Sequence, residues 1–215
     1  MSIREDQWRK VIAVMRKLDE AGCLEHVMLV GSWADYLYSA SGILPDYESR
    51  IRTLDLDFLI HNIRRPTEKK NAIELFKELG FVVESDCMTQ VTKLLDPETG
   101  FEVEFLVQQL GSGTEQYMKT NLGVTAQALR HFNILVNNKM TIEHLGMKIL
   151  VPKPEAFAIH KMVINSDRRP DKALKDQEAI QNMYPYLNNE MMEEIREGLT
   201  KKDKKLVDEF FALFL

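Results

Sequence analysis

The sequence has little cysteine: Cys23 and Cys87 are the only two in 215 residues. They stand far apart and form no CxxC pair, so neither a disulfide framework nor a cysteine-based zinc site is expected. No apolar run approaches the roughly 18–20 residues that a membrane-spanning helix needs. Residues 1–17 alternate charged with apolar side chains and lack the apolar core of a signal peptide. We therefore predict a cytoplasmic protein without a membrane partner.

The sequence also lacks an excess of positive charge, because its formal net charge is -5. This total does not indicate a protein that binds nucleic acid through bulk charge, although a local basic patch is compatible with it. Glycine (10) and proline (7) are scarce, and 45% of the residues are hydrophobic. Such a composition is typical of a globular protein, with enough length for one large domain or two small ones.

Hydrophobic spacing predicts an α/β fold, in which a mixed, largely antiparallel sheet flanked by helices precedes a helical part. Helices are predicted at 5–21, 33–40 and 68–79, and strands at 27–30, 55–60, 81–85, 90–95 and 101–107. Residues 111–120 are predicted to be a loop, and less regular strands are predicted at 132–136, 140–144 and 147–151. Further helices are predicted at 154–164, 170–183, 189–199 and 201–215. We place one domain at residues 1–150 and a helical C-terminal subdomain at 151–215.

Two carboxylates stand close together in the sequence LDLDFLI at residues 54–60. Residues i and i+2 of a strand point to the same face, so Asp55 and Asp57 are predicted to lie side by side. Neighbouring anions repel each other unless a cation compensates them. The pair is therefore the first indication of a metal site. The alternative is an exposed face of a sheet with no metal.

A turn that suits phosphate precedes this pair. The predicted strand at 27–30 ends at Gly31, and Ser32 is predicted to cap the helix at 33–40. A turn from a strand into a helix directs backbone N–H groups and a helix N-terminus at one point, where an anion is stabilised. A Gly-Ser turn by itself is common in proteins without any such function.

A second acidic strand is predicted at 101–107, in the sequence FEVEFLV. Glu102 and Glu104 alternate with apolar residues and share one face of this strand. They are the candidates for a third carboxylate beside Asp55 and Asp57. Carboxylates of this kind on an antiparallel strand are more often solvated than catalytic.

Taken together, these motifs resemble the nucleotidyltransferase superfamily that includes DNA polymerase beta. The shared pattern is an apolar strand, Gly-Ser, a helix, a strand with Asp-x-Asp, and a later carboxylate on another strand, over about residues 27–107. The sequences IRTLDLDFLI and FEVEFLV are similar to a bacterial branch that includes abortive-infection and toxin-type nucleotidyltransferases. The domain at 1–150 is accordingly expected to be the catalytic one.

The resemblance implies roles for individual residues. It assigns the triphosphate to Gly31 and Ser32, and Mg²⁺, as two ions, to Asp55 and Asp57 with a third carboxylate. That third carboxylate, which would deprotonate or orient the acceptor hydroxyl, is Glu104, with Glu102 as the alternative.

The predicted helical C-terminus carries a second set of candidates for nucleotide binding, all of them basic: Lys161, Arg168, Lys172 and Lys175. The last three are spaced by four and three residues and so lie near one face of a helix. Lysine can neutralise phosphate as a point charge. The alternative is a solvated face on which Asp171 and Asp176 pair with the lysines.

The predicted reaction is transfer of a nucleoside monophosphate from an NTP to a hydroxyl acceptor, with release of pyrophosphate. The acceptor could be a small molecule, a protein or RNA. Two other classes stay open. One is a catalytically inert member of the fold that binds a nucleotide or a partner, such as a toxin–antitoxin component. The other is an enzyme acting on a cationic, aminoglycoside-like small molecule.

Overall fold

The structure is a computed structural model that describes residues 3–50, 53–85, 90–109, 111 and 116–214. Cys87 and the first two residues of IRTLDLDFLI lie outside these ranges, and Cys23 is a buried free thiol. The chain divides into two compact units of interleaved segments. The sheet unit comprises Met1–Trp33, Arg52–Arg130 and Thr141–Val151, and the helical unit comprises Ala34–Ile51, His131–Met140 and Pro152–Leu215. The predicted domain boundary at residue 150 stays a prediction.

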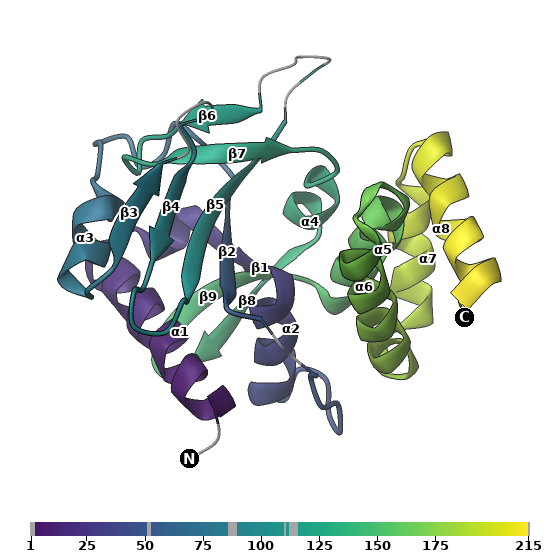
Figure 1. The fold of residues 1–215 in the computed structure, drawn as a ribbon. Coiled ribbons are helices and arrows are strands. Elements are labelled where there is room, and N and C mark those ends of the chain that lie inside the picture. The colour runs from purple at the N-terminus through teal and green to yellow at the C-terminus, as the bar shows by residue number, and fades with distance from the viewer. Residues whose placement is uncertain (1–2, 51–52, 86–89, 110, 112–115, 215) are drawn as a thin grey trace. The chain divides into compact units, whose positions relative to one another are not determined.

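The sheet unit is organised by a mixed sheet, in which the described strands run in the order β1-β2-β5-β4-β3 (Figure 1). Strand β7 pairs with β5, and β6 pairs with β7. The bounds are β1 Val27–Val30, β2 Asp55–Ile60, β3 Val82–Ser85, β4 Thr92–Leu95, β5 Glu102–Gln108, β6 Tyr117–Lys119 and β7 Thr125–Leu129. The pairs β2–β5 and β5–β7 are parallel, and the other pairs of this sheet are antiparallel. The predicted α/β fold class is thereby confirmed.

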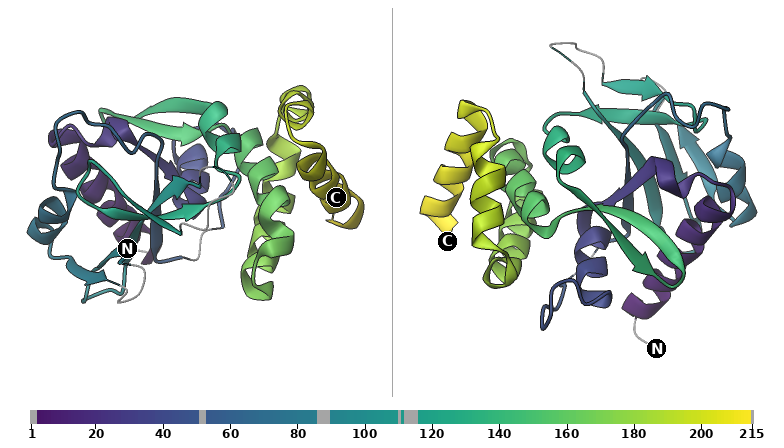
Figure 2. Two further views of the ribbon diagram at one scale, coloured as in Figure 1. Left: turned by 90° about the horizontal axis from the view of Figure 1, so that it is seen from above. Right: turned by 180° about the vertical axis from the view of Figure 1, so that it is seen from behind.

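One face of this sheet is apolar because apolar and acidic side chains alternate along the first part of β2 and of β5. Leu56 and Phe58 of β2 and Val103 and Phe105 of β5 are fully buried. The rings of Phe58 and Phe105 stack with centroids 6.0 Å apart, and Phe76 meets Phe105 edge-on at 5.9 Å. Phe76 belongs to α3 (Ala72–Glu78), and α1 (Ile3–Glu20) lies on the side of the sheet turned to the viewer in the rear view of Figure 2. The acidic residues of β2 and β5 therefore lie on the opposite face.

The helical unit is organised around α5 (Pro154–Ile164), whose residues 154–163 are buried. Helix α5 contacts α4 (Asn133–Asn137), α6 (Pro170–Met183), α7 (Asn189–Glu197) and α8 (Lys201–Phe214). Short 3-10 helices of this unit lie at Asn165–Asp167 and Tyr184–Tyr186. The sheet unit has one at Leu24–His26, together with most of a separate two-stranded sheet in which β8 (Lys139–His144) pairs with β9 (Met147–Pro152). Apart from Glu155, His160 and Lys161, the buried residues of α5 are apolar, and burial is expected of a helix that is apolar on most sides. Within the described residues, no helix is both long enough and apolar enough to cross a membrane.

Three predicted elements are wrong. The strand predicted at 132–136 is the helix α4, because a short apolar run fits either structure and Asn138 closes the helix by donating its side-chain amide to the Ile134 carbonyl (2.9 Å). The loop predicted at 111–120 contains β6, and no strand was predicted at the position of its partner β7. The helix predicted from residue 68 starts at Ala72, because the backbone N–H groups of Lys70 and Ala72 donate to the carbonyls of Asn121 and Leu122 instead.

Candidate functional site

The acidic residues of β2 and β5 lie opposite one another in the sheet. In the parallel register, Asp55 pairs with Glu102 and Asp57 pairs with Glu104. Directly paired residues of neighbouring strands point to the same face. All of these side chains are half-buried, so they remain accessible to solvent and ligands. The structure therefore brings together the carboxylates that the sequence indicated from two separate stretches.

Gly31 is placed against this acidic face. Its neighbour Val30, the last residue of β1, pairs with Asp57 in the antiparallel register. Gly31 has a φ of +66°, and a Cβ atom at this position would lie 2.5 Å from the Asp57 Oδ2. Only glycine therefore fits both the backbone conformation and the close approach of the carboxylate. The turn at Gly31 and the Asp-x-Asp strand are therefore in direct contact at Asp57.

Helix α2 (Gly31–Ala40) begins directly at this turn. The prediction that Ser32 caps a helix starting at residue 33 is wrong, because the helix starts at Gly31 and Ser32 lies inside it. Ser32 lies in the first turn and is half-buried. The first N–H groups of a helix have no partner within it and favour negative charge. Both features suit contact with a phosphate.

Lys93 of β4 is a basic residue of this face that the sequence analysis did not single out. It pairs with Glu104 in the register, and its ammonium nitrogen lies 2.5 Å from the Glu104 Oε1 and 3.8 Å from the Glu102 Oε2. The hydrogen bond to Glu104 raises the pKa of Lys93, so the ammonium stays charged. The signal in the sequence was weak, since one lysine in a short strand is usually solvated.

The acidic face suits a hard cation only in part. Carboxylate oxygens are the ligands that Mg²⁺ prefers, and Asp55 and Asp57 provide them side by side. Among the described residues, however, no three Asp, Glu, His or Cys side chains are grouped so that they could hold a metal ion. A site with fewer than three such side chains is compatible with Mg²⁺, which is usually bound by one or two carboxylates together with substrate phosphates and water. Asp55 and Asp57 fit such a site, while Glu104 is engaged with Lys93.

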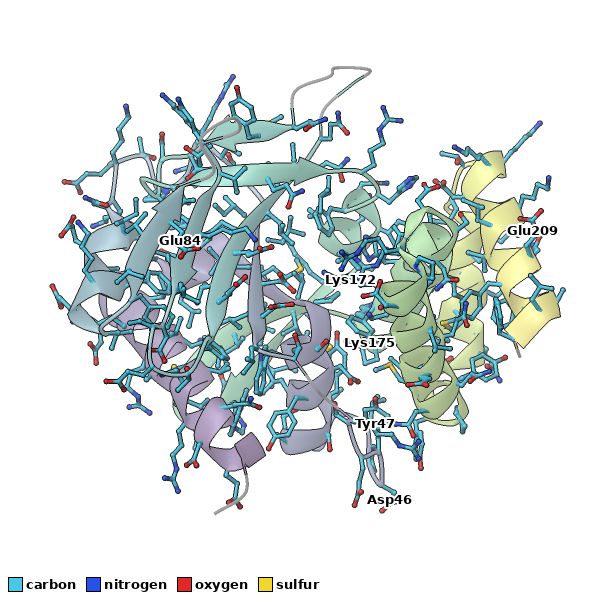
Figure 3. All side chains as sticks on the ribbon, in the orientation of Figure 1. Asp46, Tyr47, Glu84, Lys172, Lys175 and Glu209 are labelled. Carbon is cyan, nitrogen blue, oxygen red and sulfur yellow. The ribbon has the colours of Figure 1, made fainter. Side chains whose placement is uncertain are left out.

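The basic candidates of the C-terminal part lie in the helical unit and differ in their surroundings. Lys161 is buried in α5 and forms an ion pair with Asp176 of α6. The Arg168 Nε donates to the other oxygen of Asp176 at 2.9 Å. Lys172 and Lys175 are exposed on α6 (Figure 3). The structure thus groups Lys161 with Arg168 around one carboxylate and leaves the other two outside that group.

The charges of Lys161 and Arg168 keep the buried Asp176 ionised. Burial alone would raise the pKa of Asp176, but the nearby charges of Lys161 and Arg168 outweigh burial and lower it. The alternative was a solvated face on which Asp171 and Asp176 pair with the lysines. Lys172 and Lys175 are indeed exposed, whereas Asp176 is only 3% exposed and pairs with the buried Lys161, and Asp171 pairs with Arg169. A role of these four basic residues in nucleotide binding stays a prediction.

His160, the neighbour of Lys161, is expected to make folding depend on pH. Burial is the largest of the causes that lower its pKa to about 3; the charges of Lys161, His131 and Arg168 act in the same direction, and Asp176 opposes them. Its ring stacks on Phe132 with centroids 5.3 Å apart. Between pH 6.5 and about 3 the unfolded chain binds a proton that the folded chain does not, so stability is lost as the pH falls through this window.

We expect the free energy of unfolding to fall by about 2 kcal/mol between pH 7 and pH 5 through this residue alone. Urea unfolding at both pH values measures it. In His160→Leu most of that dependence should vanish, whereas His144→Leu should keep it, because His144 is only partly buried. An equal pH dependence in wild type and His160→Leu would contradict the assignment.

Asp35 of α2 is a buried carboxylate of the helical unit that the sequence analysis also missed. It accepts hydrogen bonds from the Tyr47 hydroxyl (2.5 Å) and the Ser49 hydroxyl (2.6 Å). Burial raises the pKa of Asp35 against these two hydrogen bonds. The contacts tether the segment after α2, where Asp46 and Tyr47 are marked in Figure 3, to the helix itself. The available signal was an aspartate among the apolar residues of a predicted helix.

Comparison with known proteins adds to this geometry. A family model described as Nucleotidyltransferase matches residues 9–201. Among solved structures, ANT(2″)-Ia in complex with adenylyl-2″-tobramycin is 12% identical with a TM-score of 0.50, covering 98% of this chain and 99% of that one. An antigenic nucleotidyltransferase-like protein from Paracoccidioides brasiliensis is 17% identical with a TM-score of 0.47, covering 96% and 93%. No curated protein sequence matches significantly. The likeness to ANT(2″)-Ia is one of fold.

Proposed function

Because this chain belongs to the nucleotidyltransferase family, we propose that it transfers a nucleoside monophosphate from an NTP to an acceptor hydroxyl and releases pyrophosphate. The observation that carries the proposal is the meeting of Gly31 with Asp57 on the acidic face, where a missing Cβ makes room for a carboxylate oxygen. Asp57 in turn lies opposite Glu104. A turn suited to phosphate thus adjoins carboxylates suited to a cation and to a proton.

We propose Asp55 and Asp57 as the residues that hold Mg²⁺, with two ions as the number that the family resemblance implies. Their oxygen donors and partial exposure fit a cation that is shared with the phosphates of the nucleotide. Once bound, such ions would supply charge stabilisation for the phosphoryl group and the departing pyrophosphate. The chain's contribution is to fix the two carboxylates on one strand between β1 and β5.

The remaining roles follow from position. The N–H groups at the start of α2, with the hydroxyl of Ser32, would bind the triphosphate. Glu104, half-buried in β5, would accept the proton of the acceptor hydroxyl as that oxygen attacks the phosphorus. Glu102 lies nearer the start of the same strand and is the alternative. Lys161, Arg168, Lys172 and Lys175 stay proposed nucleotide contacts.

The acceptor class that we favour is a cationic small molecule, and RNA is the less favoured one. The net charge of -5 favours a cationic small molecule, and the ANT(2″)-Ia structure, which shares the fold, holds adenylyl-2″-tobramycin. An RNA acceptor would call for a wider basic surface than the sequence offers. The cytoplasmic location stays a prediction.

The test is incubation of the protein with each radiolabelled NTP, Mg²⁺ and a panel of acceptors: an aminoglycoside such as tobramycin, total RNA and a cell extract. We expect a labelled product and one pyrophosphate released for each label transferred. No labelled product with any acceptor, together with retained equilibrium binding of NTP, would favour the inert member of the fold, such as a toxin–antitoxin component.

A further inference from the structure

A row of charged residues crosses the sheet unit at one level of its strands. Glu84 of β3 pairs with Lys93 of β4, Lys93 pairs with Glu104 of β5, and Glu104 pairs with Asp57 of β2. Residues paired in this way point to the same face of the sheet. Glu84, at the outer end of the row, is marked in Figure 3. Lys93 therefore has an acidic neighbour on either side.

Lys93 contacts the inner one of these neighbours. Its Nζ lies 2.5 Å from the Glu104 Oε1 and 3.8 Å from the Glu102 Oε2. Within the part of the chain that the structure describes, no ion pair joins Lys93 to Glu84. The Lys93 side chain is 42% exposed and that of Glu104 only 22%, so the ion pair is partly buried. Since β4 lies on the edge of β5 opposite to β2, the contact draws the Glu104 carboxylate away from Asp57.

We propose that Lys93 is a positioning residue that keeps Glu104 out of the cation site of Asp55 and Asp57 and reserves it for the acceptor. The ammonium occupies one carboxylate oxygen, Oε1, and leaves Oε2 open. As the acceptor oxygen forms its bond to phosphorus and the bond to pyrophosphate breaks, the hydroxyl proton passes to Glu104 Oε2. Lys93 also neutralises one of the carboxylates that face the incoming triphosphate. The inference rests on the proposed function, but it makes a separate statement about metal affinity.

The experiment measures equilibrium binding of Mn²⁺ alone, followed by its paramagnetic resonance signal, to the full chain without nucleotide. In Lys93→Met, Glu104 is released and can turn to the cation, so Mn²⁺ should bind up to about fivefold tighter, the scale of a partly exposed ion pair. Lys93→Arg keeps the charge and should bind like wild type. In Glu104→Gln, adding Lys93→Met should bring no further gain, because the two residues act through one contact.

Unchanged Mn²⁺ affinity in Lys93→Met would overturn the proposal. So would a gain that persists in the Glu104→Gln background, because it would show a general effect of charge. Glu84→Gln is the matched control for charge on the other side of Lys93, and a change of similar size there would count against the proposal in the same way. Lys93→Gln serves as the second variant should Lys93→Met not fold.

A kinetic measurement completes the test. We expect Lys93→Met to lower kcat by about tenfold or more, as for loss of a positioned general base, with little change in KM for the NTP, and Lys93→Arg to restore most of kcat. Loss in KM alone would assign Lys93 to nucleotide binding and overturn the positioning role. If wild type shows no turnover at all, the proposed function fails while the Mn²⁺ titration still decides on the contact between Lys93 and Glu104.

Discussion

Replacing Asp57 by Asn should lower the rate of nucleotide transfer on the order of a thousandfold, equivalent to about 4 kcal/mol of transition-state stabilisation. The amide keeps the size of the side chain but removes the negative charge that the proposed cation needs. Asp57 also faces Gly31 and pairs with Glu104, so it adjoins both the turn and the second acidic strand. Asp55→Asn should act in the same direction. The measurement is single-turnover transfer from labelled NTP to the acceptor identified in the panel above.

The same substitution should leave the fold intact. Asp55 and Asp57 are like charges on one face of a strand, and their repulsion opposes folding. Asp57→Asn relieves that repulsion, so its free energy of unfolding should equal or exceed that of wild type, as is common when a functional residue is removed. Rapid transfer by a stably folded Asp57→Asn variant would overturn the proposed role.

Glu84→Gln is the matched control for this prediction. It makes the same acid-to-amide change, on the same row of paired residues, at an exposed position two strands away from β5. Its transfer rate should stay within about twofold of wild type, since exposed charges at such a distance are largely screened.

A comparison of Glu104→Gln with Glu102→Gln decides which glutamate is the third carboxylate. Only replacement of the true base should lower the transfer rate by about 100-fold or more.

Gly31→Ala is expected to be the most damaging change outside the carboxylates. The new Cβ would lie 2.5 Å from the Asp57 Oδ2, in a backbone conformation with a φ of +66°. Left-handed backbone costs a non-glycine residue about 1–2 kcal/mol, and forcing a close contact apart adds about 1–3 kcal/mol. We expect a loss of about 2–5 kcal/mol in the free energy of unfolding, measured by urea titration. Displacement of Asp57 should also lower transfer by about 100-fold.

Gly22→Ala separates the two contributions. Gly22 has nearly the same φ, +64°, but a Cβ there meets nothing within 4 Å. Its replacement by Ala should therefore cost only the backbone term, about 1–2 kcal/mol, and leave transfer unchanged. If Gly31→Ala and Gly22→Ala lose stability equally and both keep their activity, the close approach of Gly31 to Asp57 has no functional meaning.

Local patterns were enough to predict the acidic strands and the long helices. Alternation places Asp55 and Asp57 on one face whatever the rest of the fold does, because side chains alternate along any strand. Pro170 and the spacing behind it predicted a helix over 170–183, which is the extent of α6. Weak or ambiguous patterns failed. The strand β7 buries only Ala126 and Ala128, which are poor strand formers, and the short apolar run at Ile134 became a helix.

What the sequence by itself determined is therefore the chemistry on each element: two carboxylates on one strand, two on another, and a glycine at the end of a third. The tertiary structure alone decided which of them meet. The parallel pairing of β2 with β5 set Asp57 opposite Glu104, and the antiparallel pairing of β4 brought Lys93 to the same carboxylate. Strand order and register depend on contacts between residues distant in sequence, and a shift by one residue would turn each of these side chains to the other face.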